Sequence, residues 1–253
     1  MKLGKKKQME MQENFETLGG NLSFAAKEAY KLLRTNLAYI LTELEDKDCH
    51  VIGVTSSLRG EGKSTTAINL SYTLAEMNSR VLLVEGDMRI PSLHKKLNMT
   101  SDRGLSRVLV SRKDADVVDW SCITRIKNDN NIDFDVLLAG EIPPNPSELL
   151  GSNRMQSLLN SLSAYYDYII IDLPPVTAVT DALVASKLVD GLIVVVRSGY
   201  ADRGSLDETL RQIQMVNGRV LGFVMTCADA GGGAYGKKYR YHYRYRYYQK
   251  DYK

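Results

Sequence analysis

Apolar residues along this chain fall into short, β-branched runs that alternate with segments of helical periodicity. A helical pattern begins at Leu22, and Leu33, Leu37, Ile40 and Leu41 recur in it at steps of three and four residues. Strands are expected at 51–55, 80–87, 135–140, 166–175, 191–197 and 219–226, and further helices at 63–77, 147–163, 178–188 and 203–216. Runs that are apolar throughout are typical of parallel strands buried on both faces. The pattern therefore predicts an α/β fold with a doubly wound, mostly parallel sheet, whose ligands lie beyond the carboxyl ends of the strands.

The two ends of the chain differ in composition from the segment between them. We expect a flexible arm at 1–22, one domain at 23–230, and a flexible tail at 231–253 that starts with three glycines. Residues 235–253 hold four lysines and three arginines against one aspartate, which is a net charge of +6. The whole chain carries +3, so residues 1–234 carry −3. A mildly acidic body therefore precedes a strongly basic tail.

The sequence indicates a cytoplasmic protein. No apolar run approaches the roughly 18 residues that a membrane span needs. The first residues, MKLGKKKQMEMQENFE, lack the apolar stretch of a signal peptide. Cys49, Cys122 and Cys227 are odd in number and form neither a CxxC pair nor a zinc-binding set with the histidines. These features fit a reducing compartment.

The stretch SSLRGEGKST, residues 56–65, partly matches the phosphate-loop pattern GxxxxGK[ST]. Gly62, Lys63 and Ser64 match, while Ser57 stands where the first glycine is expected. A strand precedes the stretch and a helix follows it, so successive N–H groups and the helix N-terminus can face phosphate oxygens. The alternative is a solvated turn that happens to carry a lysine. The expected nucleotide-binding residues are Arg59, Gly60, Glu61, Gly62, Lys63, Ser64 and Thr65.

Three acidic residues end apolar strands near this loop. Asp172 ends the run from Tyr168, which is where a Walker B acid holds the hydration shell of Mg²⁺. Glu85 and Asp87 follow another strand two residues apart, and an extended chain would direct both carboxylates to one side. Each acid taken singly could merely cap the next helix. Their convergence on one phosphate loop indicates a catalytic site that binds ATP with Mg²⁺.

Taken together, GEGKST, VLLVEGDMRIP, AGEIPPNPSELL and YIIIDLPPV with a terminal tyrosine cluster resemble the bacterial tyrosine kinases (BY-kinases) of capsule and exopolysaccharide synthesis. The resemblance extends from about Ala25 to the C-terminus and implies a P-loop fold like that of partitioning ATPases. It places the Walker A, A′ and B motifs on 57–65, 81–89 and 168–172. The first A′ acid of the family is usually aspartate, and Glu85 stands in its place here. Residues 23–230 would then be a P-loop kinase domain.

Phosphoryl transfer depends on positioning and charge stabilisation. Lys63 would reach the β- and γ-phosphates, and Ser64, Asp87 and Asp172 would bind Mg²⁺. A phenol has a pKa near 10 and is protonated in water, so a carboxylate that accepts its proton would help. Either Asp87 or Glu85 is the candidate base, and the sequence leaves both open. The expected catalytic residues are Lys63, Glu85, Asp87 and Asp172.

Much of the tyrosine content lies in the basic tail. Its alternating residues could form a strand, stack on single-stranded nucleic acid, or contact an anionic membrane surface, but the body shows no matching basic groove. We favour a fourth hypothesis, in which the tail is the substrate and each phosphate adds about −1.5 to −2 charges. The expected autophosphorylation sites are Tyr235, Tyr239, Tyr241, Tyr243, Tyr245, Tyr247, Tyr248 and Tyr252.

Glu28, Lys31 and Arg34 recur every three residues and share one polar sector of the first helix. A solvated helix face with an i,i+3 ion pair explains them equally well. In the family that the chain resembles, an ExxRxxR motif at this place joins subunits into a ring. Lys31 replaces the first arginine, and lysine cannot reproduce a bidentate arginine contact. Ring assembly is the expectation.

The resemblance implies further partners, namely a membrane adaptor that activates the kinase at the inner face of the membrane and a cognate phosphotyrosine phosphatase. No nucleic acid is expected. The main alternative function is a partitioning-type ATPase, a dimer switch without a protein acceptor. Such ATPases usually carry a second lysine near the start of the loop, where this chain has Ser56, Ser57, Leu58 and Arg59. A nonenzymatic polyanion or lipid binder, led by its tail, is a third possibility.

Overall fold

The computed structural model describes residues 22–43, 47–100, 102–111, 118–127 and 132–228. Most of the expected domain 23–230 falls within these ranges. The expected arm at 1–22, apart from Leu22, and the tail at 231–253 with all its tyrosines lie outside the described residues.

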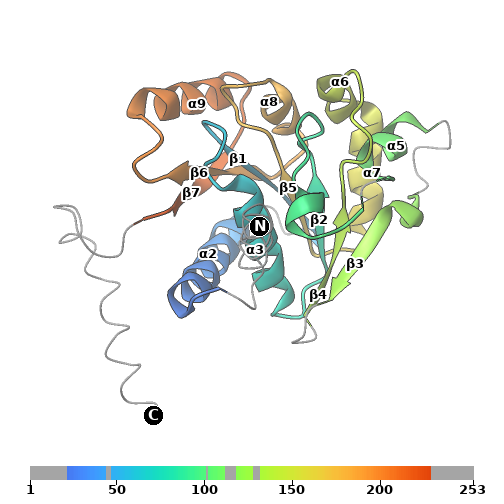
Figure 1. Cartoon of the computed structure of the whole chain (residues 1–253), viewed down its shortest axis with the longest axis horizontal. Coiled ribbons are helices and arrows are strands. Elements are labelled where there is room, and N and C mark those ends of the chain that lie inside the picture. The colour runs from blue at the N-terminus through green and yellow to red at the C-terminus, as the bar shows by residue number, and fades with distance from the viewer. Residues whose placement is uncertain (1–21, 44–46, 101, 112–117, 128–131, 229–253) are drawn as a thin grey trace, which may run out of the picture.

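The described residues form a seven-stranded sheet in the order β3-β4-β2-β5-β1-β6-β7, shown in Figure 1. All neighbouring strands are parallel except β3, which runs antiparallel to β4. This confirms the predicted doubly wound, mostly parallel sheet. The strands are β1 His50–Ser56, β2 Val81–Glu85, β3 Ile123–Lys127, β4 Asp133–Leu137, β5 Tyr168–Asp172, β6 Gly191–Arg197 and β7 Val220–Thr226.

Helices cover both faces of the sheet and bury two hydrophobic clusters against it (Figure 1). One cluster joins α2, α3 and α4 to one face, and the other joins α5 to α9 to the opposite face. No helix of the described residues is both long and apolar enough to span a membrane. The helices are α2 Phe24–Thr42, α3 Lys63–Ala75, α4 Leu93–Lys96, α5 Leu105–Val110, the 3₁₀ turn η2 Trp120–Cys122, α6 Pro146–Leu150, α7 Asn153–Ser163, α8 Asp181–Ala185 and α9 Arg203–Met215.

The strand register brings the predicted site residues to one edge of the sheet. Strand β5 lies between β1 and β2, and Asp172 pairs in register with Val54 on one side and Glu85 on the other. The chain that leaves β1 forms the predicted phosphate loop. The acidic strand ends and the loop therefore share the carboxyl edge of the sheet, as expected for this fold class.

Two sequence expectations need correction. The helix predicted over 147–163 is two helices, because α6 stops at Leu150 and the Ser152 side chain caps a new helix by accepting from the Met155 N–H at 3.2 Å. The helix predicted over 178–188 is shorter, since α8 covers only Asp181–Ala185. Strand β3, at the edge of the sheet, was not predicted.

Candidate functional site

The phosphate loop between β1 and α3 depends on two glycines with left-handed backbone. Gly60 has φ 79° and Gly62 has φ 96°, and Gly62 is the N-cap of α3. A Cβ at Gly62 would also lie 3.2 Å from the Cγ2 atom of Thr226. Lys63, largely buried, is the first residue of α3, followed by Ser64 and Thr65. The loop and the first turn of α3 thus supply backbone N–H groups and one ammonium at a single place.

Ser57, which replaces the first glycine of the motif, is fully buried. Its Oγ accepts a hydrogen bond from Thr209 Oγ1 of α9 at 2.9 Å, and its carbonyl accepts one from Thr177 Oγ1 at 2.5 Å. The serine side chain is thus engaged with α9. Nothing in the spacing of the sequence indicates this contact with Thr209.

Glu61 fixes the conformation of the loop. Its buried carboxylate accepts hydrogen bonds from Leu58 N at 2.6 Å and from Arg197 N of β6 at 3.2 Å. Its carbonyl accepts from Thr226 Oγ1 at 2.7 Å. The Glu61 side chain therefore ties the loop to β6, while Arg59 is exposed at the tip of the loop. Lys96 Nζ of α4 lies 3.4 Å from Thr65 Oγ1 and adds a second cation beside the first turn of α3.

Asp172 is a buried acid with unused hydrogen-bonding capacity. Its side chain is 1% exposed, and among the described residues its Oδ1 atom has no hydrogen-bond partner. Burial raises the pKa of Asp172 to about 7, and the nearby Asp87 and Glu85 act in the same direction. The Lys63 ammonium and the Ser64 hydroxyl act in the opposite direction and lower this pKa. A buried oxygen without a donor is suited to a cation.

Glu85 is fully buried, and both of its carboxylate oxygens accept from backbone amides. Oε1 accepts from Ser92 N and Leu93 N, each at 2.6 Å, and Oε2 accepts from Ala139 N at 3.0 Å. Glu85 therefore holds the start of α4 and the segment after β4 against the end of β2. Its carboxylate has a structural use that the spacing of the acids did not reveal.

Asp87 lies in a different environment, because β2 ends at Glu85 and the extended spacing assumed for the two acids does not continue. Asp87 is half-buried, and its Oδ1 accepts from Ile90 N at 3.0 Å. The amides of Gly86 and Asp87 donate to the Asp172 carbonyl at 2.8 and 3.0 Å. The structure thus joins the A′ and B segments directly, with Asp87 at the more accessible position.

An ion pair between the exposed Arg89 and the buried Asp181 was not predicted. Arg89 donates to both oxygens of the fully buried Asp181 at 2.9 and 3.0 Å, and also to Ser147 Oγ at 2.9 Å. Ser147 Oγ in turn donates to Asp181 at 2.5 Å. The cluster connects the loop after β2 to α6 and α8. The sequence indicated this region only in that Arg89 and Ser147 lie within the motifs VLLVEGDMRIP and AGEIPPNPSELL.

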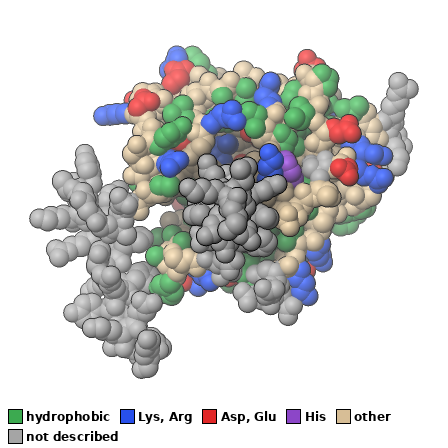
Figure 2. Space-filling model, in the orientation of Figure 1, with side chains coloured by type: hydrophobic (Ala, Val, Ile, Leu, Met, Phe, Trp, Pro, Cys, Tyr) green, Lys and Arg blue, Asp and Glu red, His purple; other side chains and the backbone are tan. Residues whose placement is uncertain are grey.

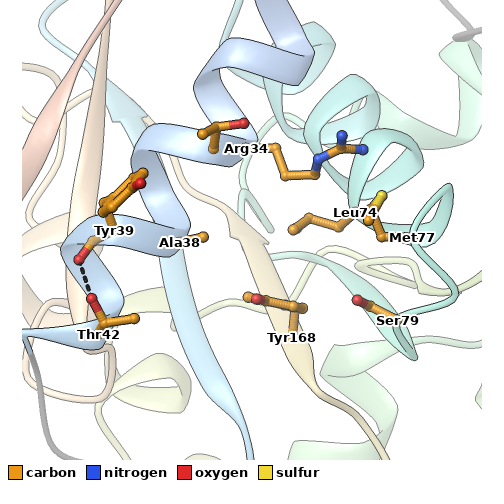
Figure 3. A pocket seen from close by; sticks show the side chains of 9 residues that line it. Arg34, Ala38, Tyr39, Thr42, Leu74, Met77, Ser79 and Tyr168 are labelled. Atoms are coloured by element: carbon orange, nitrogen blue, oxygen red, sulfur yellow. Dashed lines mark hydrogen bonds between the residues drawn. The ribbon is translucent and has the colours of Figure 1, made fainter.

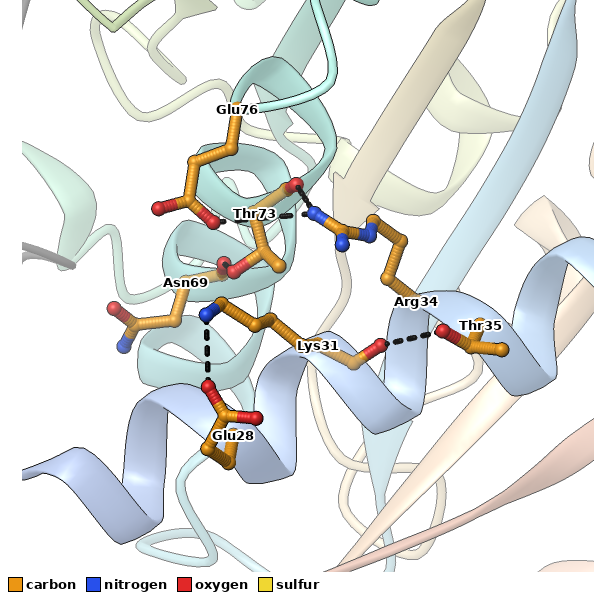
Figure 4. A network of polar contacts seen from close by, with 7 residues as sticks. All are labelled: Glu28, Lys31, Arg34, Thr35, Asn69, Thr73 and Glu76. Atoms are coloured by element: carbon orange, nitrogen blue, oxygen red, sulfur yellow. Dashed lines mark hydrogen bonds and ion pairs between the residues drawn. The ribbon is translucent and has the colours of Figure 1, made fainter. Parts of the chain in front are cut away.

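The predicted oligomer-interface residues lie on α2, and Figure 4 shows their contacts. Lys31 Nζ pairs with Glu28 Oε1 at 2.7 Å, the i,i+3 pair of the simpler interpretation. Arg34 turns toward α3, where Nη1 donates to the Thr73 carbonyl at 2.7 Å and lies 3.9 Å from Glu76 Oε2. Within the chain, Arg34 therefore fastens α2 to the end of α3. Whether these residues also join subunits stays a prediction.

A groove of about 470 Å³ lies beside Arg34, between α2 and the end of α3 (Figure 3). Its walls are mainly apolar and include Tyr39, Leu74, Met77 and Tyr168. The phosphate loop precedes the opposite end of α3. The groove is thus separate from the site formed by the loop and the acids.

Comparisons with known proteins identify chains that are similar to this one. An AAA domain family model matches residues 49–221. The tyrosine-protein kinase YwqD of Bacillus subtilis is 33% identical over 198 residues, which cover 78% of this chain and 79% of YwqD. The kinase domain of the Escherichia coli tyrosine kinase ETK superposes with a TM-score of 0.70 at 27% identity, covering 81% of this chain and 78% of that domain.

A more distant likeness concerns the fold alone. The ParA-like protein McdA of Cyanothece, solved as an ATP complex, is 22% identical with a TM-score of 0.57, and the match covers 71% of each chain. The expected likeness to partitioning ATPases in fold is thereby confirmed. The extent of the family match and the identity to YwqD show that the chain belongs to the AAA domain family and, within it, to the bacterial tyrosine kinases of capsule and exopolysaccharide synthesis.

Proposed function

We propose that this kinase transfers the γ-phosphoryl group of ATP to tyrosines of its own tail, in trans within a ring-like oligomer, and so regulates capsular or exopolysaccharide synthesis and export. Residues 23–230 would act as the kinase domain, and 231–253 as the substrate tail that follows it. The observation that carries the proposal is the buried Asp172 Oδ1 near Lys63 and the phosphate loop, which has no hydrogen-bond partner in the described part of the chain.

The residues present fit a magnesium ion. Asp172 offers a buried oxygen without a donor among the described residues, and Ser64 and Asp87 add a hydroxyl and a carboxylate close by. Hard oxygen ligands of this kind suit Mg²⁺, which keeps several waters and is held by one or two carboxylates plus phosphates. Mg²⁺, when bound, neutralises negative charge on the β- and γ-phosphates of the nucleotide. Lys63 and the loop amides share this task.

The protein groups then act on a tyrosine of a neighbouring subunit. The phenol oxygen attacks the γ-phosphorus, the bond from that phosphorus to the β,γ-bridging oxygen breaks, and ADP leaves. The phenol proton passes to Asp87, which is half-buried, whereas both oxygens of Glu85 are engaged with backbone amides. Lys63 stabilises the charge that develops on the leaving oxygen. Arg59, Gly60, Glu61, Gly62 and Thr65 complete the loop that surrounds the phosphates.

The proposed setting is cytoplasmic, at the inner face of the cell membrane through an adaptor. On the face seen in Figure 2, basic and acidic side chains of the described residues are scattered rather than gathered by sign, so the visible part of this face offers nucleic acid no broad basic surface. Subunits would meet through the α2 face that carries Glu28, Lys31 and Arg34. A phosphotyrosine phosphatase would reverse the modification.

Incubation of the full chain with γ-labelled ATP and Mg²⁺ is expected to place label on tyrosines beyond Ala234. Mapping of phosphotyrosine by mass spectrometry measures this result. A chain whose eight tail tyrosines are replaced by phenylalanine should keep its fold and lose that label. Release of free phosphate without phosphotyrosine in the unaltered chain would contradict the proposal and favour a partitioning-type ATPase.

Phosphorylation is also expected to weaken association between subunits. The segment 235–253 carries +6, so about four phosphates cancel its charge and eight make it strongly negative. Tails that dock on acidic surfaces of neighbours would then be released. Light scattering should show that ATP and Mg²⁺ reduce the oligomer size of the unaltered chain but not of the phenylalanine-tail variant. Equal dissociation of both would refute the charge switch.

A further inference from the structure

Helix α4 is short, but its position is fixed from two sides. On one side, Glu85 Oε1 accepts hydrogen bonds from Ser92 N and Leu93 N, each at 2.6 Å, which ties the start of α4 to the end of β2. On the other side, Leu93 and Leu97 are buried in the hydrophobic cluster that also includes residues of α3. The side chains of α4 therefore start from a defined place next to α3.

Two polar side chains, one from α4 and one from its N-cap, contact the first turn of α3. The N-cap residue Ser92 has its Oγ 3.2 Å from Ser64 Oγ, and Lys96 Nζ lies 3.4 Å from Thr65 Oγ1. Ser64 and Thr65 belong to the phosphate-loop motif. Helix α4 thus brings an ammonium group to the start of α3, where backbone N–H groups already attract anions.

The charge of Lys96 is not balanced by a carboxylate. Among the described residues, no acidic side chain forms an ion pair with Lys96, and the Thr65 hydroxyl that it contacts is neutral. Lys96 is half-buried, whereas its neighbour Lys95 is exposed. Withdrawing a cation from water has a free-energy cost, which an anion at the same place offsets. An ammonium has three donors, so two remain for such an anion beyond the one that reaches Thr65.

The order of residues in the first turn of α3 indicates which phosphate the ammonium meets. In a phosphate loop the lysine reaches the β- and γ-phosphates, the next hydroxyl binds Mg²⁺, and backbone amides hold the α- and β-phosphates. Lys63 and Ser64 match the first two positions, which leaves Thr65 for the α-phosphate. Building on the nucleotide binding proposed above, we propose that Lys96 is a further nucleotide-binding residue, whose ammonium pairs with the α-phosphate beside Thr65.

Equilibrium binding of ADP and ATP to the full chain tests this contact. Lys96→Met should raise the Kd of both nucleotides by about tenfold, the lower end of what a hydrogen bond to a charged group contributes, because Lys96 is half-buried. The ratio of the two Kd values should stay unchanged, since ADP and ATP share the α-phosphate. Lys95→Met removes the same charge from the same helix and should leave both Kd values unchanged. Lys96→Arg, which keeps the charge, should recover part of the loss.

A sulfur atom on the α-phosphorus identifies the phosphate that Lys96 contacts. Sulfur is a weak hydrogen-bond acceptor, so the unaltered chain should bind one diastereomer of ADPαS several-fold more weakly than ADP. In Lys96→Met this difference should disappear, as in a double-mutant cycle in which both partners are changed. A difference caused by sulfur on the β-phosphorus should persist in Lys96→Met. The tenfold effect on ADP should be the same with and without Mg²⁺, because the contact does not involve the metal.

Unchanged Kd values in a folded Lys96→Met chain would overturn the inference, and so would a loss confined to ATP, which would place Lys96 at the γ-phosphate. An effect that vanishes without Mg²⁺ would assign Lys96 to the metal site instead. The result for ADP is independent of tail labelling, because ADP binding requires no phosphoryl transfer. Failure of the unaltered chain to label its tail would therefore overturn the kinase proposal alone, whereas failure to bind ADP would overturn both.

Discussion

Replacement of Lys63 by methionine is expected to lower the rate of phosphotyrosine formation by about a hundredfold to a thousandfold, because removing one preorganised donor from a transition state typically has an effect of this size. Lys63 is largely buried at the first position of α3, in the loop that Gly60 and Gly62 shape. Methionine has similar length and helix propensity, so the fold should persist. Initial rates of tail labelling, with unfolding midpoints measured alongside, check the prediction.

The Lys63→Met variant also separates transfer in trans from transfer within one chain. Its tail tyrosines are intact, so it can serve as substrate for a second chain that keeps Lys63 but has phenylalanine in place of all tail tyrosines. Mixing the two should label the Lys63→Met chain alone. If both chains are folded and neither becomes labelled in the mixture, the acceptor tail must belong to the same chain as the active site.

The parallel core of the sheet could be predicted from the sequence because its strands are buried on both faces. Strands such as β5, with Ile169, Ile170 and Ile171, have continuous apolar runs, so their own residues predict them. The residues of strand β3 do not predict it, since it is a mostly exposed edge strand in which Arg125 pairs with Asp135 of β4. Its position depends on that neighbour and not on any pattern of its own.

The spacing of the motifs likewise indicated where the candidate site lies, but not the different surroundings of its acids. The phosphate-loop motif and the strand-ending Asp172 are local signals, and the register of β5 against β1 brings them together. The partners of Glu85 are amides of Ser92, Leu93 and Ala139, and amide groups are the same in every sequence. The different environments of Glu85 and Asp87 therefore arise from the path of the backbone after β2, which the spacing of side chains does not indicate.

The two acids of the A′ segment should consequently fail in different ways when each is replaced by its amide. Glu85→Gln presents an NH₂ group to at least one backbone N–H that now donates to the carboxylate, leaving a buried donor unsatisfied. Such a loss costs about 1–3 kcal/mol, so the free energy of unfolding should fall by that amount. Asp87→Asn should leave stability nearly unchanged and lower kcat by about a hundredfold or more. Denaturant unfolding and initial rates measure the two effects.

A loss of activity in Asp87→Asn has two possible causes, a missing base and weaker Mg²⁺ binding. Changing the acidity of the acceptor phenol distinguishes these causes. A fluorinated tyrosine has a more acidic phenol, so its transfer depends less on a carboxylate that takes the proton. With saturating Mg²⁺ and a fluorotyrosine peptide, the gap between Asp87→Asn and the unaltered chain should narrow if Asp87 is the base. If raising the Mg²⁺ concentration removes the difference in rate with the ordinary tyrosine acceptor, Asp87 acts only in metal binding. If Glu85→Gln instead lowers kcat without loss of stability while Asp87→Asn stays active, the assignment is wrong and Glu85 is the base.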